Sequence, residues 1–383
     1  MNDTKIRMVV TGGHLSPALA VIEEALKKNK FKIFYVGRKQ PLEGDKALSL
    51  EYLTMTQKKI PFYNLITGRL QREFTFHTLY SFIKFPIGLI QSFIYLMRIH
   101  PDIVLTFGGY VALPVAIAAH WLNIPIIAHE QTSILGLTNR LIAKYVKVLC
   151  LTWKNTFGVE LGINTAVTGL PIRQSLFNSK NSPSVDFGNA NYPLIYITGG
   201  NLGSHSINTV ISRSLPQLLK EHRILHQCGS ANQKKDYREL SEARKLLPES
   251  QSTNYELVTH ISPDEVGPIL SHAKILIGRS GANTCYEIGI YGLPSILIPL
   301  PWSAYHEQSQ NASVLEKQKT VRVINQSRLT TEELMKGIQV IEQNYSTYRE
   351  NGLKNRSYYS KDAAEKIVLY AIKYAKKSAI QSS

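Results

Sequence analysis

The chain has 383 residues, of which 44% are apolar and 19% charged, a composition typical of folded domains and unlike disordered or collagen-like chains. A chain of this length is expected to form two domains. Lys and Arg outnumber Asp and Glu by 44 to 28, and the net charge of +16 favours an anionic partner. Because the sequence contains no zinc-finger or RNP motif, we expect that partner not to be a nucleic acid.

The cysteines argue against a structural metal site or a disulfide framework. Cys150, Cys228 and Cys285 stand singly and far apart, with no CxxC pair. The apolar run at residues 8–10 is shorter than the core of a signal peptide. We therefore expect the chain to stay inside the cell, in a reducing compartment.

Short apolar runs alternate with helical segments along both halves of the chain. In the first half the strand-like runs are residues 6–11, 32–36, 103–106, 126–128 and 146–151. After a stretch rich in Ser, Asn and Pro, the runs are 194–198, 224–227, 275–278 and 295–298. The alternation predicts an α/β fold of two Rossmann-like domains, each a parallel sheet with helices on both faces. We expect domains over 1–177 and 193–345, a linker over 178–192, and a helical tail over 346–383.

The segment 74–97 is long and apolar enough for a helix that could span a bilayer. Lys84 near its middle argues against a span, because a central charge costs roughly 3 kcal/mol on insertion scales. Two interpretations stay open. The segment is a buried core helix, or it forms an apolar patch on a membrane surface. The net charge favours the patch, whose rim would bind anionic headgroups through Lys84, Arg69, Arg72 and Arg98.

Four segments have the pattern of a strand, a glycine turn and a helix: 8–20, 106–119, 194–208 and 274–289. Such units bring free backbone N–H groups and helix N-termini to one edge of each sheet, where open α/β sheets bind ligands. With two sheets facing each other, the expected site is a cleft between the domains.

The segment GRSGANTCYE at 278–287 carries the strongest single signal. Gly281 frees the turn, the N–H groups of residues 282–284 can bind a phosphate, and Glu287 can accept two hydrogen bonds from a ribose diol. An equally good explanation is a capping box, in which Thr284 caps the helix and Glu287 returns to the N–H of Thr284.

Three further residues are candidates for chemistry in the first half. His14 follows the first glycine turn, ahead of Ser16 as a helix cap and Pro17 as a first helical residue, and can act as a base or bind phosphate. Glu130 follows a strand and can act as a base or orient an acceptor hydroxyl. Arg173 can hold a diphosphate. The structural alternatives are a locally bonded loop histidine, a surface carboxylate and an interdomain salt bridge.

Several catalytic motifs are missing from the sequence. It has no Walker A lysine, no complete GxGxxG, no HExxH and no DxD pair. P-loop NTPases, dinucleotide dehydrogenases and metal-bridged transferases are therefore disfavoured, and we expect neither a metal nor a cofactor.

In order along the chain, TGGHLSPALA, FGGYVALP, HEQTSILGLTNR, TGLPIR, ITGGNLGSHSIN, GRSGANTCYEIGIYGLPSILIP and HEQSQNA resemble the MurG family. The resemblance extends from about residue 5 to about residue 325. It implies the two-domain glycosyltransferase B architecture, with the last helix returning to the first domain. It also implies transfer of N-acetylglucosamine from UDP-N-acetylglucosamine to lipid I, a polyprenyl-diphosphate acceptor, to form lipid II at the cytoplasmic face of the membrane.

The resemblance also implies roles for individual residues. The family's acceptor-side positions correspond to His14, Tyr110 and Glu130. Its donor-side positions correspond to Thr11, Gly12, Gly13, Thr132, Arg173, Asn201, Ile261, Ala282, Asn283, Thr284, Cys285, Glu287 and Gln308. The family inverts the anomeric carbon without a covalent intermediate, so a base would deprotonate the muramyl 4-hydroxyl while helix N-termini stabilise the leaving diphosphate.

Three departures from the family pattern bear on substrate choice. The first glycine loop is shorter than in the family, Thr132 stands where the family usually has Asn, and Asn201 stands where it usually has Ser. Two other functions stay open: a UDP-N-acetylglucosamine 2-epimerase, which shares the fold and needs no lipid, and an inactive membrane-associated scaffold.

Overall fold

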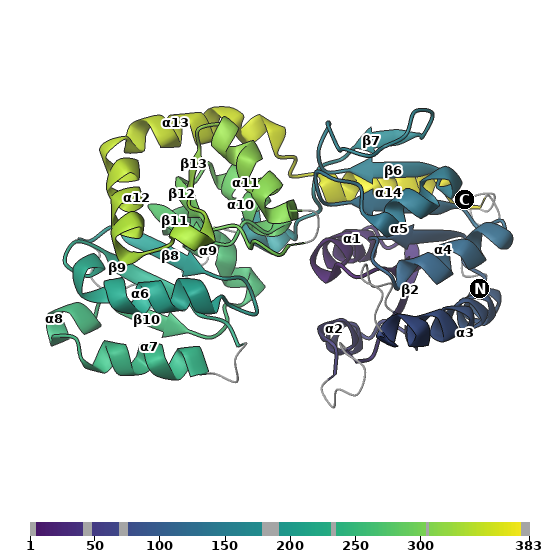
Figure 1. Ribbon diagram of the computed structural model, residues 1–383. Coiled ribbons are helices and arrows are strands. Elements are labelled where there is room, and N and C mark those ends of the chain that lie inside the picture. Colours follow the sequence, from purple (N-terminus) through teal and green to yellow (C-terminus); the bar gives the residue numbers. More distant parts are fainter. Residues whose placement is uncertain are drawn as a thin grey trace. The chain divides into compact units, whose positions relative to one another are not determined.

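The computed structural model describes residues 5–40, 48–68, 76–177, 191–230, 235–303 and 306–376. The chain divides into two compact units, drawn in Figure 1. Unit 1 consists of Met1–Arg173 and Lys361–Ser383, and unit 2 of Gln174–Ser360. Most of the expected linker, residues 178–190, lies outside the described residues.

Unit 1 is built on a seven-stranded parallel sheet in the order β3-β2-β1-β4-β5-β6-β7. The strands are β1 (Ile6–Thr11), β2 (Phe31–Gly37), β3 (Phe62–Asn64), β4 (Ile103–Thr106), β5 (Ile126–Glu130), β6 (Val148–Leu151) and β7 (Thr165–Val167). The helices are α1 (Leu15–Lys27), α2 (Leu50–Gln57), α3 (Phe76–Ile99), α4 (Ala112–Trp121), α5 (Leu137–Ile142), the short 3₁₀ helix η1 (Ala143–Tyr145) and α14 (Ala363–Tyr374).

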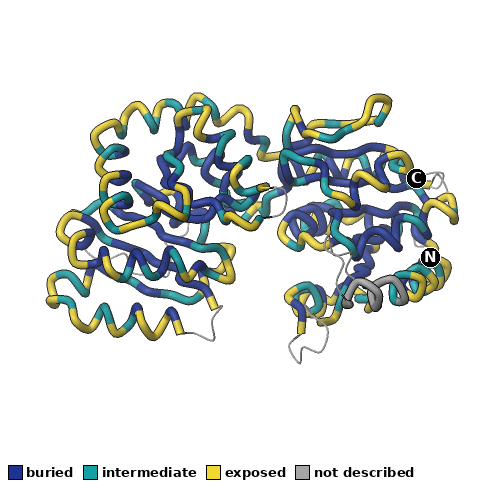
Figure 2. The backbone as a smooth tube through the Cα atoms, viewed as in Figure 1, coloured by how far each residue is buried: buried dark blue, intermediate teal, exposed yellow. Residues whose placement is uncertain are grey.

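Apolar side chains cover both faces of this sheet because successive residues of a strand point to opposite sides. On β1, Met8 and Val10 pack into one core with α1 and α14, while Val9 packs into the other with α3, α4 and α5. β4 and β5 are buried throughout and β1 is buried except at Arg7, in line with the dark blue of the central strands in Figure 2. The predicted Rossmann-like α/β layering is confirmed for this unit.

Unit 2 repeats the plan with a six-stranded parallel sheet in the order β10-β9-β8-β11-β12-β13. The strands are β8 (Leu194–Thr198), β9 (Arg223–Gln227), β10 (Tyr255–Val258), β11 (Ile275–Gly278), β12 (Ser295–Leu297) and β13 (Val321–Val323). The helices are α6 (His205–Leu218), α7 (Lys235–Lys245), α8 (Glu249–Ser252), α9 (Pro263–His272), α10 (Ala282–Tyr291), α11 (Glu307–Lys317), α12 (Thr331–Gln343) and α13 (Tyr345–Asn355), with 3₁₀ helices η2 (Gln174–Phe177), η5 (Gln326–Arg328) and η6 (Arg356–Tyr358).

The two last helices belong to different units. α13 packs on α10 within unit 2. α14, the yellow helix among the elements of unit 1 in Figure 1, packs on α1, where Lys28 Nζ lies 2.8 Å from Glu365 Oε1. Its end is tied down by the N–H of Lys376, which donates to the carbonyl of Asp102 at 3.1 Å.

The apolar segment around residue 86 forms one helix, α3, rather than a pair. Leu96 and Ile99 are buried in the core of unit 1, whereas Ile87, Ile90, Ile94 and Met97 are 43%, 61%, 40% and 51% exposed. Their spacing places these four residues on one face, which we call the α3 stripe. Arg69 and Arg72 lie outside the described residues. Among the helices described, none has the length and hydropathy to cross a membrane.

Candidate active site

The glycine turns of unit 1 lie where the strand order reverses. The sheet order places β1 beside β4, so the loops after these two strands flank the switch point at which open α/β sheets bind ligands. Gly12 has φ +140°, and a Cβ there would lie 2.8 Å from the backbone nitrogen of Phe107. The N–H of Gly13 donates to the carbonyl of Gly108 at 3.0 Å. The two loops therefore pack backbone against backbone, which only glycine permits.

This packing limits what the first glycine turn offers a ligand. The N–H of Gly13 is already used, and the Thr11 side chain is fully buried with no hydrogen bond to its hydroxyl among the described residues. α1 begins at Leu15 with His14 as its cap residue, so the expected cap at Ser16 and the expected first helical residue, Pro17, each lie two residues too late. The N–H groups here that have no partner within the helix belong to Leu15 and Ser16.

His14 is exposed and contacts the loop after β5. Its Nδ1 lies 2.9 Å from Nε2 of Gln131, a residue that sequence reasoning missed. Desolvation by the surrounding protein lowers the pKa of His14 below 6.5, although the carboxylate of Glu130 raises it, and the residue keeps access to solvent. A neutral, accessible imidazole at neutral pH has the state that a general base requires.

Glu130 is buried and accepts four hydrogen bonds. Its Oε1 accepts from the N–H and hydroxyl of Thr132 at 3.0 and 2.8 Å, and its Oε2 accepts from the N–H of Gly136 and the amide of Asn139 at 2.8 and 2.9 Å. These donors fill the acceptor positions of a carboxylate. Glu130 therefore holds the loop 131–136 in place, and the hydroxyl of Thr132 is used as one of the donors to this carboxylate.

Replacing Glu130 by Gln is expected to lower the free energy of unfolding by about 1–3 kcal/mol, because the amide NH₂ would face donors and leave buried groups unpaired. Urea unfolding of the two proteins measures the change. Thr132→Val, which removes one hydroxyl, serves as control with a loss of about 1 kcal/mol. A large loss of turnover with unchanged unfolding would instead indicate that Glu130 acts on the substrate.

Tyr110 also lies at this edge and is paired with a residue that the sequence did not indicate. Nη1 of Arg38, just beyond β2, donates to the Tyr110 hydroxyl at 2.6 Å, and the guanidinium lies 5.7 Å from the centre of the ring. Burial raises the pKa of neighbouring Glu51 to about 7, although Arg38 lowers it. Because the Tyr110 oxygen accepts from Arg38, its own proton stays available to a ligand.

In unit 2 the corresponding switch point lies between β8 and β11, which pair directly. Gly203 has φ +82°, and a Cβ there would overlap the carbonyl oxygen of Cys228, so the loop after β8 fits only with glycine. Asn201 at the tip of this loop is exposed.

The start of α10 distinguishes between the two explanations of GRSGANTCYE. The cap residue is Gly281, not Thr284, so the capping box is wrong. The N–H of Cys285 donates to the carbonyl of Gly281, whereas Ala282, Asn283 and Thr284 occupy the first three helical positions, whose N–H groups have no partner within the helix. Cys285 itself is fully buried and faces the core.

Glu287 lies one turn further into α10 and is partly buried. Among the described residues, its carboxylate makes no hydrogen bond or ion pair, and burial raises its pKa to about 7. An unpaired, desolvated carboxylate beside three free N–H groups is suited to accept hydrogen bonds from a ligand that also carries an anion.

Arg279, between β11 and the glycine turn, is the third residue that sequence reasoning missed, after Gln131 and Arg38. It is 9% exposed and donates to the carbonyls of Ile298 and Pro299, to the Ser206 hydroxyl at 2.9 Å and to Oε1 of Gln326 at 2.6 Å. Burial lowers its pKa to about 10. All four acceptors are neutral, so its positive charge adds to the electropositive helix termini at this edge of the sheet.

Three other predicted residues differ in which of their groups remain available to a ligand. Ile261 is buried after β10, which leaves its backbone to contact a ligand. Gln308 on α11 uses Oε1 to accept from the N–H of Leu300 at 3.0 Å, and its amide nitrogen has no partner among the described residues. Arg173, at the end of unit 1, likewise has no described hydrogen bond or ion pair.

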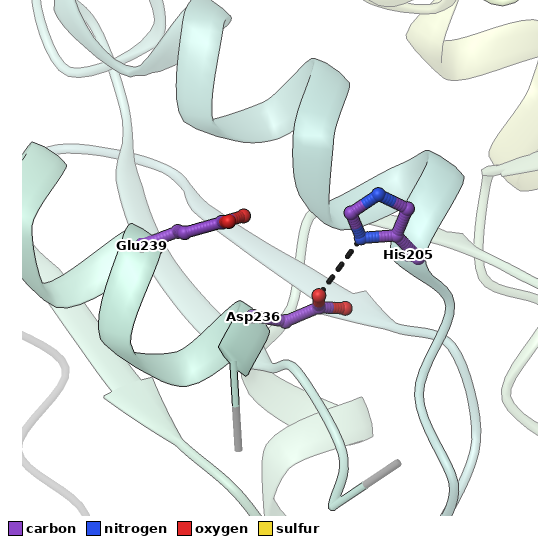
Figure 3. A group of neighbouring side chains, drawn as sticks. All are labelled: His205, Asp236 and Glu239. Carbon is purple, nitrogen blue, oxygen red and sulfur yellow. Dashed lines mark hydrogen bonds and ion pairs between the residues drawn. The ribbon is translucent and has the colours of Figure 1, made fainter. Parts of the chain in front are cut away.

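One group of side chains in the described part of unit 2 has a set of atoms that metals accept. Figure 3 shows His205 at the start of α6 and Asp236 and Glu239 on α7, whose ligand atoms lie within 4.8 Å of one another. Other side chains already contact the two carboxylates. His205 Nδ1 lies within hydrogen-bond distance of Asp236, at 2.8 Å, Lys235 lies 3.6 Å from Glu239, and Arg213 lines the adjacent cavity. These contacts account for the group without a metal.

Two family models match the chain, one within unit 1 and one over most of unit 2 and the first residues of α14. Residues 8–150 match the glycosyltransferase family 28 N-terminal domain, and residues 194–367 match the glycosyltransferase family 28 C-terminal domain.

Curated relatives match nearly the whole chain. A Clostridium perfringens UDP-N-acetylglucosamine--N-acetylmuramyl-(pentapeptide) pyrophosphoryl-undecaprenol N-acetylglucosamine transferase is 31% identical over 351 residues, covering 90% of this chain and 92% of the relative. The Treponema denticola protein of the same name is 30% identical and covers 82% of this chain and 81% of the relative.

Solved structures agree in fold. Acinetobacter baumannii MurG superposes with a TM-score of 0.70 at 24% identity, covering 96% of this chain and 99% of that one. A Neisseria meningitidis UDP-GlcNAc 2-epimerase superposes with a TM-score of 0.65 at 15% identity, covering 96% and 99%. At these identities the structures establish the fold alone.

Proposed function

Because this chain belongs to the MurG family of glycosyltransferases, we propose that it transfers N-acetylglucosamine from UDP-N-acetylglucosamine to the muramyl 4-hydroxyl of lipid I, forming lipid II for peptidoglycan synthesis. The observation that supports this most directly is the carboxylate of Glu287, unpaired among the described residues and one turn beyond three free N–H groups. That arrangement matches a ribose diol joined to a phosphate.

On unit 2 we assign the donor. The N–H groups of Ala282, Asn283 and Thr284 bind the α-phosphate, and Glu287 accepts from both ribose hydroxyls. The buried charge of Arg279 stabilises the diphosphate as it leaves, when its negative charge increases. The free amide nitrogen of Gln308 is left to donate to the sugar.

On unit 1 we assign the acceptor chemistry. His14 removes the proton of the attacking hydroxyl, while Glu130 fixes the loop that contacts His14. Arg38 and Tyr110 have N–H and O–H donors that no described residue uses, and at the same sheet edge these donors contact anionic groups of the acceptor. The reaction is one in-line displacement: the hydroxyl oxygen bonds to the anomeric carbon as the bond to UDP breaks.

The deciding experiment is transfer of radiolabelled sugar from several UDP-sugars to lipid I in liposomes. We expect labelled lipid II only from UDP-N-acetylglucosamine, with one UDP released per sugar transferred. UDP-N-acetylglucosamine incubated without lipid is expected to remain unchanged. A manno product in that incubation would indicate the epimerase, and nucleotide binding without transfer to any acceptor would indicate the scaffold.

We further propose that unit 1 binds the cytoplasmic face of the membrane peripherally through the α3 stripe, with Lys84 and Arg98 beside it and anionic lipid as the electrostatic partner. Replacing Ile90 and Met97 by Glu is expected to weaken binding to vesicles of anionic lipid by at least about 10-fold, since each buried side chain contributes about 1.5–3 kcal/mol. Sedimentation with vesicles measures the loss.

The matched control is Leu246→Glu, which changes an 87% exposed leucine on unit 2. It should bind vesicles as the parent does. Turnover of a water-soluble acceptor should be similar for all three proteins, whereas turnover of lipid I in vesicles should fall only when the α3 stripe is changed. Equal vesicle binding by the double variant and the parent would rule out the stripe as the membrane surface.

A further inference from the structure

The contact between Gln131 and His14 joins two loops that are far apart in the sequence. The amide nitrogen of Gln131 lies 2.9 Å from Nδ1 of His14, and neither side chain has another hydrogen bond among the described residues. The contact therefore controls one nitrogen of the imidazole and leaves the other, Nε2, open to a ligand.

The Gln131 amide can form a hydrogen bond with Nδ1 of His14 in two orientations. If its nitrogen faces the ring, Nδ1 accepts, and a neutral imidazole then carries its proton on Nε2. If its oxygen faces the ring, Nδ1–H donates, and Nε2 has a free electron pair. The two orientations have the same shape and differ by a half-turn of the amide. Only the second makes Nε2 a base.

The backbone on both sides of the contact is anchored. Glu130 anchors the loop of Gln131 through Gly136 and Asn139. His14 caps α1, and the residue before it donates to Gly108. A half-turn of the Gln131 amide thus changes the chemistry of His14 without moving either loop.

We propose that Gln131 is a positioning residue that sets the tautomer of His14, with its amide oxygen accepting from Nδ1–H during transfer. This rests on the proposed function. In the step, the acceptor O–H bond breaks and its proton goes to Nε2. The oxygen bonds to the anomeric carbon, and the electron pair of the breaking bond leaves with UDP. The imidazolium keeps Nδ1–H donated to Gln131.

Two substitutions of similar length test the orientation. Gln131→Glu offers only acceptor oxygens when ionised, and Gln131→Lys offers only donors. We expect Gln131→Glu to keep kcat within about 10-fold of the parent, and Gln131→Lys to lower kcat by 10²-fold or more, the scale of general-base catalysis. The kcat of Gln131→Leu, which has neither a donor nor an acceptor at this position, should lie between those of the other two variants. The KM for UDP-N-acetylglucosamine should stay within a few-fold of the parent in all three.

The pH dependence supplies a readout that a purely structural role would not change. The groups facing His14 electrostatically are Glu130, which raises its pKa, and His129, whose own pKa falls to about 4 through burial. A new carboxylate at 131 should move the acid limb of the kcat profile to higher pH, and a new ammonium should move it to lower pH. Equal losses for all three variants with unmoved profiles would refute the proposal.

A direct measurement separates this inference from the transferase assignment. In protein labelled with ¹⁵N-histidine, the two ring nitrogens of a neutral imidazole have distinct shifts, which identify the protonated one. The Glu variant should hold the proton on Nδ1 and the Lys variant on Nε2. An unchanged tautomer of His14 in both, with unaltered thermal unfolding, would overturn the proposal whether or not the protein transfers sugar. Absence of lipid II from the parent would overturn the proposed function alone.

Discussion

Replacing His14 by Ala is expected to lower kcat by about 10²- to 10⁴-fold, the range that a positioned general base contributes. KM for UDP-N-acetylglucosamine should change only a few-fold, because the donor contacts assigned above lie on unit 2. Initial rates at saturating donor and lipid I measure the effect. His120→Ala, at the end of α4, is the matched control and should retain parental kcat. Turnover of His14→Ala within a few-fold of the parent would remove His14 as the base.

The pH profile of kcat in the parent follows from the same assignment. A base must be neutral, and desolvation holds the pKa of His14 below 6.5. As pH falls, kcat should therefore stay level through 6.5 and decline only below it. A decline that begins above pH 7 would point to a different base.

Replacing Glu287 by Ala is expected to lower kcat/KM for UDP-N-acetylglucosamine by about 10²-fold, mostly through KM. Each hydrogen bond from a ribose hydroxyl to a carboxylate is worth about 1.5–3 kcal/mol, and 1.4 kcal/mol corresponds to a factor of ten. Titration calorimetry with UDP measures the same loss without an acceptor. Glu249→Ala on α8 is the control. Unchanged UDP affinity would contradict the ribose assignment.

Glu287 also links function to stability. Its folded-state pKa of about 7 exceeds the ordinary value of 4.5, so the ionised group destabilises the fold. Below pH 4.5, Glu287 is protonated in both the folded and the unfolded protein, so it does not lower the free energy of unfolding. Between pH 4.5 and 7, Glu287 ionises in the unfolded protein but stays largely protonated in the folded one, so the free energy of unfolding falls as the pH rises. At pH 8, the free energy of unfolding of Glu287→Gln should therefore exceed that of the parent by an amount on the order of 2–3 kcal/mol, measured by urea unfolding. Near pH 4 the two proteins should unfold at the same urea concentration.

The sequence predicted the central strands of both sheets and missed the outermost ones. β4, β8 and β11 are short runs of mainly apolar residues because both faces are buried, and β1 follows the same pattern apart from the partly buried Arg7. The missed strands β3, β7, β10 and β13 lie at the edges of the two sheets. They are three or four residues long and partly exposed, so their pattern resembles that of a loop.

For the candidate site, the sequence predicted what depends on local geometry. The glycine turns follow from strand, turn and helix succession, and they lie at both switch points. Arg38, Gln131 and Arg279 were missed because their partners are remote: Tyr110 is 72 positions from Arg38, and His14 is 117 positions from Gln131. No periodicity in the sequence encodes such pairs, which exist only once the strands are aligned.

The packing of α14 on α1 has a consequence for how the chain folds during synthesis. Unit 2 is one continuous stretch, Gln174–Ser360, and can fold as soon as that stretch leaves the ribosome. Unit 1 receives α14 from residues that are translated after the whole of unit 2. The unit translated first is therefore completed last, with the apolar surface of α1 awaiting a partner more than 300 residues downstream, where Lys28 meets Glu365. A nascent chain that stalls before residue 361 would expose that surface to chaperones.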